Sequence, residues 1–593
     1  MTSGDASGVD QGPAGRAVAG RAVAAVLGGL LLAFLAATGA RALNVPDEGR
    51  YAEVAREMLR LGDWVTPRLD GVPFLDKPPL FYWLEAGGFA LFGVHVWSAR
   101  LVPALLGFAG CAMVYGAGAR LRGRRAGLLA ALLLAANPYY FGASQYVNHD
   151  LAVATFITAA ILAFALGDRS EGRARAGWLH AGYAAMGMAV MTKGLIGLVL
   201  PFGAVGLFVL ATGRWRELAR YHLPTGLLLA AAVAVPWHLV AQGRNPDLLH
   251  YLFVVQHFQR YAGSGFNNPA GPLFYPLAIA AGLLPWSPLL PAACARAWRA
   301  FRAAPGPART ELLLLAWPLV VVAFFSIPRS KIAGYALPAL PPLALLAALE
   351  LDARLNADPL RNRARRLPLL VSAAAMGVLG VGLIVAPFTP LLRAALSLPV
   401  AAWAALCGAG AVVAGIVAWR AAGQGRPARA VAAQVAFAAA LTAGVLPALT
   451  GALGDTSRPL AEALAPRLQP GDVVACYRRY LYDLPVYLDR RAPLVVAEHW
   501  GDPGIPERDN WQRELWLGRE WEPASRAWLV EPAELAARCR GARCFVLARS
   551  RDLGELSGLL PLASANGIAL LATPEAAGPV GLSATPVPGA AGR

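Results

Sequence analysis

The stretch between residues 41 and 98 carries the charged side chains whose types and spacing could do chemistry. Asp47 and Glu48 open a run with helical periodicity, and Lys77 is followed directly by two prolines. Carboxylates beside long apolar segments cost solvation free energy unless they are paired or used. The prolines fix the backbone after Lys77, so its ammonium is held in a defined place. These residues are candidate site residues. The alternatives are a helix N-cap with a solvated acid, and a lysine that snorkels at a membrane interface.

An amphipathic helix must position the acidic pair. Between Asp47 and Met58, the residues Tyr51, Val54 and Ala55 share one face at helical spacing. A carboxylate in the first turn of a helix interacts favourably with the helix dipole, which suits Asp47 at the N-terminus. We therefore expect a helix that begins at Asp47.

The composition places this helix in a membrane protein. Of 593 residues, 57% are hydrophobic and only 15% are charged, whereas soluble domains carry about a quarter charged residues. This excludes a soluble globular enzyme, a coiled coil and a disordered chain. Apolar runs long enough to span a bilayer recur along the sequence. They predict about thirteen transmembrane helices, near residues 18–40, 98–118, 126–142, 150–167, 177–192, 194–211, 223–241, 273–293, 311–327, 335–350, 367–388, 399–419 and 430–450.

The arginines give the orientation of the spans. The net charge of +17 would suggest nucleic acid in a soluble protein, but the arginines cluster in alternate loops between apolar runs, as cytoplasmic loops do. Residues 41–85 carry a net charge of −2 instead. We therefore expect a cytoplasmic tail at 1–17, a transmembrane domain at 18–452, and the loop 41–98 outside. An odd number of spans also puts the C-terminal part outside.

The C-terminal part has a different pattern. Between residues 453 and 573, short strand-like runs alternate with helical stretches, which predicts an extracytoplasmic α/β domain. The strand-like runs are DVVACY (472–477), LVVAEH (494–499), CFVLARS (544–550) and GIALLAT (567–573). The tail 574–593 is rich in Pro, Gly and Ala, and we expect it to be flexible. Cys539 and Cys544 permit a disulfide in an oxidising compartment, a labile metal pair, or two free thiols.

A set of motifs identifies a family. The sequence resembles the polyprenyl-phosphate-dependent glycosyltransferases of the GT-C superfamily, above all the bacterial transferases that add aminoarabinose to lipid A, which are related to protein O-mannosyltransferases. The resemblance falls in order over residues 18–350. Its motifs are PDEGRYAExAREM (46–58), GDWVTP (62–67), DKPPLxYW (76–83), NHD (148–150), TKG (192–194), PWH (236–238), HYLFVVQHFQRY (250–261), GLLPW (282–286) and SKxxxYxLPALPP (330–342).

The resemblance implies a polytopic helical GT-C enzyme in the bacterial inner membrane, with its active site and C-terminal domain on the periplasmic side. It implies an inverting glycosyltransferase that uses an undecaprenyl phosphate-linked sugar, with 4-amino-4-deoxy-L-arabinose and a lipid A phosphate as the preferred donor sugar and acceptor. The alternatives are transfer of another sugar to a glycan, a lipid or a protein Ser/Thr, and a polyprenyl-lipid transporter. Its partners would be these substrates and membrane lipids, not nucleic acid.

The resemblance also assigns roles to residues. Such a reaction needs a carboxylate near the acceptor and cations near the leaving phosphate. The carboxylates carried over are Asp47, Glu48 and Asp150. The phosphate-binding candidates carried over are Arg50, Lys77, Lys193, Lys331 and Tyr335.

A metal is the open point of the resemblance. Asp76 and His257 match positions that bind a divalent ion such as zinc in related transferases, although Asp76 stands where Glu is common. The alternative is a plain His–Asp hydrogen bond. The resemblance implies no cofactor for the reaction, so an ion here would be structural.

Overall fold

The computed structural model describes residues 13–259, 268–303, 309–355, 366–390, 397–441 and 455–577. Most of the expected tail 1–17, the end of the last expected span and residues 578–593 lie outside these ranges.

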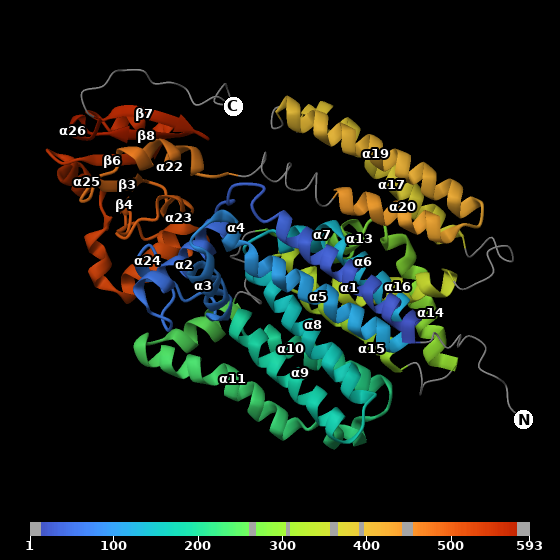
Figure 1. Ribbon diagram of the computed structural model, residues 1–593. Coiled ribbons are helices and arrows are strands. Elements are labelled where there is room, and N and C mark those ends of the chain that lie inside the picture. Colours follow the sequence, from blue (N-terminus) through green and yellow to red (C-terminus); the bar gives the residue numbers. More distant parts are fainter. Residues whose placement is uncertain are drawn as a thin grey trace, which may run out of the picture.

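A bundle of helices forms the larger part of the molecule (Figure 1). Within the described residues, six helices are long and apolar enough to cross a membrane, or up to eight if two sharply bent pairs each count as one span. The chain is therefore a helical membrane protein. Its bundle helices are α1 (Pro13–Ala36), α5 (Leu101–Arg122), α6 (Arg124–Ala135), α7 (Pro138–Ser144), α8 (His149–Asp168), α9 (Gly172–Lys193), α10 (Ile196–Ala211), α11 (Leu223–Arg244), α13 (Phe274–Gly282), α14 (Leu290–Ala303), α15 (Arg309–Ser326), α16 (Leu340–Leu355), α17 (Leu367–Val385), α19 (Leu398–Gly423) and α20 (Pro427–Ala440).

Small residues let neighbouring helices approach closely. A Cβ on Gly380 in α17 would lie 2.6 Å from the carbonyl oxygen of Gly408 in α19, and one on Gly118 in α5 would lie 2.9 Å from the Cα of Gly127 in α6. In a bilayer, such close backbone contact replaces the hydrophobic effect as the source of helix association. The many Gly and Ala residues of the sequence thus set the spacing of the bundle.

Arginine-rich loops meet at one end of the bundle. Arg122 at the end of α5 pairs with Glu311 at the start of α15 at 3.0 Å. Arg296 in α14 pairs with Glu350 near the end of α16 at 2.9 Å, and Arg125 in α6 pairs with Asp352 at 2.6 Å. The loops that the sequence groups together by charge therefore lie together in space.

The segment between α1 and α5 forms a cap at the opposite end. It contains α2 (Asp47–Leu61), α3 (Leu80–Phe92), α4 (Val96–Ala99) and a small hairpin of β1 (Arg68–Leu69) and β2 (Val72–Pro73). The helix expected from Asp47 is confirmed. It ends at Gly62, which adopts a left-handed conformation (φ 68°) and donates its N–H to the Met58 carbonyl at 3.1 Å, a turn that glycine makes at little cost.

The C-terminal residues form a mixed sheet of six strands in the order β5-β4-β3-β6-β8-β7. The first four strands in this order are parallel, and β8 and β7 are antiparallel to their neighbours. The elements are α22 (Arg458–Leu464), β3 (Val473–Tyr477), α23 (Leu484–Leu488), β4 (Val495–Ala497), α24 (Trp511–Trp521), β5 (Leu529–Val530), α25 (Pro532–Cys539), β6 (Cys544–Arg549), β7 (Leu560–Ala565), β8 (Ile568–Ala572) and α26 (Pro574–Ala577).

The four strand-like runs of the sequence form β3, β4, β6 and β8, whereas β5 and β7 are additional. The sequence does not predict β5 because two residues are too few to show alternation. It does not predict β7 because Pro561 is atypical of a strand interior. The expected tail 574–593 begins in α26, which packs against β6, β7 and β8.

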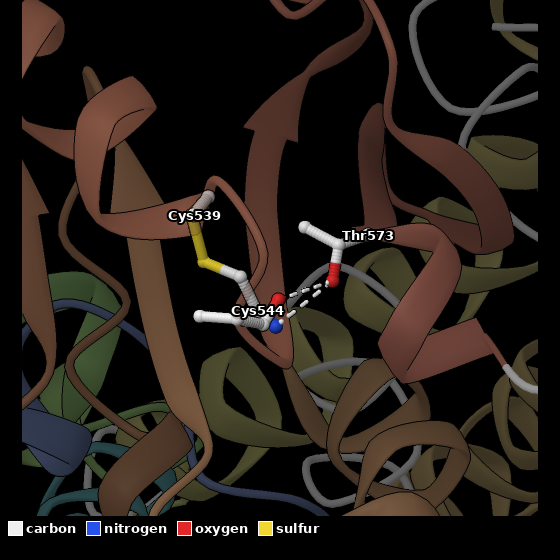
Figure 2. The surroundings of a disulfide bond; sticks show 4 residues. Cys539, Cys544 and Thr573 are labelled. Atoms are coloured by element: carbon white, nitrogen blue, oxygen red, sulfur yellow. Dashed lines mark hydrogen bonds between the residues drawn. A yellow bond between two sulfur atoms is a disulfide. The ribbon is translucent and has the colours of Figure 1, made fainter.

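A disulfide closes the turn between α25 and β6. Cys539 and Cys544 are bonded, and the Cys544 N–H donates to Thr573 Oγ1 at 3.1 Å (Figure 2). Of the three possibilities that the sequence leaves open for these thiols, the structure contains the disulfide.

The cap and the C-terminal sheet share one hydrophobic core. Apolar residues of α2 and α3 pack with apolar residues of β3, β4, β6 and β8 in a single cluster, and Figure 1 shows the sheet beside these two helices. Hydrogen bonds reinforce the contact: the Leu494 N–H donates to Asp70 Oδ1 at 2.8 Å, and the Val45 N–H donates to the Asp455 carbonyl at 3.1 Å. The sheet therefore holds the helix that begins at Asp47.

Candidate active site

A cavity of about 660 Å³ lies where the cap meets the bundle. Asp47 at the start of α2 and Asp150 at the start of α8 both line it. Most of its wall is apolar, and the other polar lining residues are Arg41, Asn148, Gln145, Tyr139 and Tyr146. A largely apolar cavity with a few convergent polar groups is the usual form of a ligand site.

Asp47 is the more open of the two carboxylates, with 32% of its side chain exposed. Its Oδ1 pairs with Arg50 one turn along α2. Its Oδ2 lies 3.5 Å from the Asn148 amide nitrogen, at the limit of a hydrogen bond. One oxygen is thus held by a cation, and the other faces a weak, neutral partner.

Arg50 is enclosed between two carboxylates and two rings. It pairs with Asp47 and with Glu514 of α24. Its guanidinium lies over the ring of Tyr51 at 5.2 Å and over the ring of Tyr482 at 5.3 Å. The charge is therefore fixed in place beside the cavity.

Asp150 forms the second ion pair of the site. The Asn148 side chain caps α8 by accepting the Asp150 N–H at 2.9 Å. The Asp150 carboxylate pairs with Lys193, the last residue of α9, and both side chains are about nine-tenths buried. The Lys193 ammonium lies 4.6 Å from the centre of the Tyr335 ring. Three of the predicted site residues thus form one contact chain.

Glu48 is deep in the cap and does not line the cavity. Its side chain is fully buried and pairs with Arg41 and Arg100. Its two oxygens also accept the Asn44 and Val147 N–H groups at 2.9 and 3.1 Å. Burial alone would raise the pKa of the Glu48 carboxyl, but Arg100 and Arg41 outweigh burial and lower it from its ordinary value. The carboxylate therefore stays ionised and fully engaged.

Lys331 also lies apart from the cavity lining. It is 3% exposed, and its ammonium donates to the carbonyls of Ser326 at 2.8 Å and Phe325 at 3.3 Å, and to that of Pro328. Two of these carbonyls end α15, where a cation stabilises the negative end of the helix dipole.

Lys77 and Asp76 sit beside a helix that carries His257. The Lys77 ammonium donates to the Asp76 carbonyl at 3.0 Å. Asp76 Oδ1 accepts from the Tyr251 hydroxyl and, at 3.1 Å, from the Gln256 amide, both on η2 (His250–Gln259). The side chain of His257 lies outside the described residues. Among those that are described, no three His, Cys, Asp or Glu side chains gather as a metal site.

An aromatic cluster joins these groups. The His149 ring lies 4.7 Å from Tyr51, 4.6 Å from Phe81 and 4.8 Å from Tyr82, measured between ring centres. His149 lies within electrostatic range of Lys77, Lys193 and Arg50, and Tyr51 within range of Asp47 and Asp76. The predicted cations and carboxylates therefore converge on one cluster, except for Lys331 and the enclosed Glu48.

Sequence reasoning missed Glu514, Tyr482 and Arg100. Glu514 and Tyr482 belong to a region without a motif, and their contacts with Arg50 cross more than 400 residues. Arg100 follows α4 at the edge of an apolar run, where a flanking cation is ordinary. No local signal separates it from its neighbours.

Comparison of the sequence with known proteins identifies relatives of this chain. A family model described as dolichyl-phosphate-mannose-protein mannosyltransferase matches residues 11–252. The undecaprenyl phosphate-alpha-4-amino-4-deoxy-L-arabinose arabinosyl transferase of Pseudomonas aeruginosa (strain LESB58) is 33% identical over 77% of this chain and 86% of its own length. The matches with transferase 2 of Pseudomonas fluorescens (34% identical, 56% of this chain) and with that of Erwinia tasmaniensis (36% identical, 52% of this chain) span only 60% and 55% of those relatives' lengths.

A solved structure has the same fold. The crystal structure of ArnT from Cupriavidus metallidurans bound to undecaprenyl phosphate superposes with a TM-score of 0.80 at 27% identity, over 95% of this chain and 100% of that one. The apo form gives a TM-score of 0.78.

Proposed function

The chain belongs to the family of undecaprenyl phosphate-aminoarabinose arabinosyl transferases, with their helical GT-C fold, and from this we propose that it transfers 4-amino-4-deoxy-L-arabinose from undecaprenyl phosphate to a phosphate of lipid A. The observation that carries the proposal is the shared cavity of Asp47 and Asp150, with Arg50 and Lys193 paired to them.

The reaction is a single inverting displacement. An oxygen of the acceptor phosphate attacks the anomeric carbon, and the bond from that carbon to the donor phosphate breaks, so undecaprenyl phosphate leaves with the bonding electrons. An acceptor phosphate is already anionic at neutral pH and needs no strong base. Asp47 therefore orients the acceptor and the sugar through its less engaged oxygen. Arg41, which lines the same cavity, offsets the charge of the incoming phosphate.

The cations serve the leaving group. Negative charge grows on the donor phosphate as the glycosidic bond breaks, and fixed cations in a water-poor site stabilise it. Lys77, Arg50 and Lys193 all lie within electrostatic range of His149 and are the groups that we assign to this phosphate. Tyr335 packs on Lys193 and keeps its ammonium in place.

Two predicted site residues receive supporting roles. Glu48 orients α2 from within the cap, because all its contacts are internal. Lys331 fixes the end of α15 and, through it, the loop that leads to Tyr335.

We propose thirteen spans, with the N-terminus in the cytoplasm and the cavity and sheet on the periplasmic side of the bacterial inner membrane. The gathering of arginines at the far end of the bundle supports this orientation. The Cys539–Cys544 disulfide supports an oxidising compartment for the sheet.

We further propose that transfer needs no cofactor. One Asp76 oxygen already accepts hydrogen bonds from the neutral donors Tyr251 and Gln256. A structural ion at Asp76 and His257 would appear as one equivalent of bound zinc that is lost in the Asp76→Ala variant.

The test uses purified full-length protein, undecaprenyl phosphate-aminoarabinose and lipid A, with the product mass as readout. We expect one added aminoarabinose on a lipid A phosphate. Asp47→Asn should lower turnover about 100-fold while the variant still inserts into the membrane. Lys77→Ala should weaken binding of undecaprenyl phosphate. The control is Glu462→Gln, an exposed side chain in α22.

Other outcomes identify the alternatives. A product of different mass would indicate another sugar or another acceptor, such as a glycan or a protein. Movement of the lipid-linked sugar across vesicles without transfer would indicate a transporter. Full activity of Asp47→Asn would reject the assigned site.

A further inference from the structure

Two residues of the C-terminal region reach into the site and hold Arg50. Glu514 lies in α24, and one of its oxygens, Oε1, pairs with Nη1 of Arg50. The other, Oε2, accepts from the Tyr482 hydroxyl at 2.6 Å. The Tyr482 ring in turn lies 5.3 Å from the guanidinium. Tyr482 thus holds Glu514 in place, and Glu514 in turn holds Arg50.

The guanidinium is shared between the two carboxylates, one nitrogen to each. Nη1 contacts Glu514, whereas Nη2 contacts Oδ1 of Asp47. The side chains of Arg50 and Glu514 are only 13% and 15% exposed, so water cannot readily take the place of either partner. A planar guanidinium prefers to bind one carboxylate through two parallel hydrogen bonds. Here Glu514 occupies the nitrogen that would otherwise turn toward Asp47.

We propose that Glu514 is a positioning residue for the transfer reaction: it divides the Arg50 fork, so that Asp47 is held through one oxygen and keeps the other for the substrate. This rests on the proposed function, and it gives the C-terminal sheet a part in the reaction without contact with the reacting atoms. Without the Glu514 charge, Arg50 closes on both oxygens of Asp47 and turnover falls.

The pH profile should report the same contact. Burial raises the pKa of the Glu514 carboxyl above its ordinary value, and Arg50 opposes this rise. The charged and titratable groups that act on Glu514 are Arg50, Asp76, Tyr482 and Asp47. As pH falls, protonation of Glu514 releases Arg50. Activity should therefore fall as the pH is lowered, which gives the pH profile an acid limb. A variant that cannot titrate at this position should lack this acid limb.

The experiment measures turnover and pH dependence in four full-length variants. Glu514→Gln keeps the shape and removes the charge, and should lower kcat about 10- to 100-fold, with the fall in activity at acid pH lost. Glu514→Asp keeps the charge and should retain the limb with intermediate activity, which also serves if Glu514→Gln folds poorly. The double variant Arg50→Ala with Glu514→Gln should be no less active than Arg50→Ala alone, because Glu514 acts only through Arg50.

A matched pair supplies the control. Arg68 of β1 and Glu522, directly after α24, form another ion pair between the cap and the C-terminal region, and their side chains are 21% and 34% exposed. Glu522→Gln should leave kcat within twofold of wild type. Two results would overturn the positioning role and leave the proposed function standing. In the first, the wild type transfers sugar and the kcat of Glu514→Gln is within twofold of it. In the second, the effects of Arg50→Ala and Glu514→Gln on kcat multiply in the double variant. A wild type that transfers no sugar would reject the proposed function, and this role with it.

Discussion

Arg100 and Glu48 face each other in a two-point ion pair that is shut off from solvent. Arg100 Nε donates to Glu48 Oε1 at 2.8 Å, and Nη2 donates to Oε2 at 2.9 Å. Arg100 also donates to the carbonyls of Thr38, Arg41 and Ala42, which leave α1. The pair therefore ties the first turn of α2 to the end of α1 and the start of α5.

Glu48→Gln should destabilise the protein by about 3–5 kcal/mol, because it leaves a buried guanidinium without its counter-charge. The measurement is the apparent unfolding temperature in detergent. Glu462→Gln, whose carboxylate is 63% exposed, should change it little. An unchanged unfolding temperature for Glu48→Gln would show that the pair does not anchor the cap.

Gly334→Ala should impair transfer by moving Asp150. A Cβ at this position would lie 2.6 Å from the Asp150 Cγ and closer still to Oδ2, so the carboxylate must shift from its present place beside Lys193. We expect a fall in kcat/KM of about 100-fold, as for other small displacements of a reacting group. Gly87→Ala in α3 is the matched control, since its Cβ would meet nothing within 4 Å. Equal activities would argue that Asp150 is not needed in this position.

Asp483→Asn should flatten the dependence of stability on pH. Asp483 accepts the Ser457 N–H at 2.9 Å and the Ser457 and Thr456 hydroxyls, and burial raises the pKa of its carboxyl from 3.8 to about 6. A raised folded pKa contributes stability that is complete below the ordinary value and is lost as pH rises through about 6. The wild type should lose up to about 3 kcal/mol from this group between pH 3.8 and 7.

The check is unfolding temperature against pH for both proteins. Other carboxylates contribute equally to the two curves, so the difference reports Asp483. Parallel curves would contradict the prediction.

Replacement of Cys539 and Cys544 by serine should cost about 2 kcal/mol, the chain-entropy value for a closed loop as short as this one. Dithiothreitol should lower the unfolding temperature of the wild type to that of the double-serine variant, and it should leave the unfolding temperature of the variant unchanged. A shift in both proteins would mean that reduction acts elsewhere.

Local patterns predicted much of this arrangement. Helical spacing gave α2 its start at Asp47, and alternation of short apolar runs gave four strands of the sheet. The motifs brought Asp47, Asp150, Arg50 and Lys193 onto one site, and the structure places them in two ion pairs beside one cavity.

Tertiary contacts determine the side-chain positions that local patterns did not predict. Lys331 belongs to the same motif as Tyr335, yet its ammonium donates to the carbonyls of Phe325 and Ser326 at the end of α15, only six and five residues earlier in the chain. Glu48 differs from Asp47 by one position along a helix, which is enough to turn it from the cavity toward Arg100. Glu514 reaches Arg50 only once the sheet packs on the cap, and no spacing within either segment encodes that meeting.

The shared core of cap and sheet constrains how the protein matures. Arg56 of α2 pairs with Asp489, which follows 433 residues later. At the usual pace of translation, the ribosome needs roughly 20–90 s to make the intervening chain. During that interval α2 exists without its packing partner, so a nascent chain arrested before the sheet should be inert however well its spans have inserted.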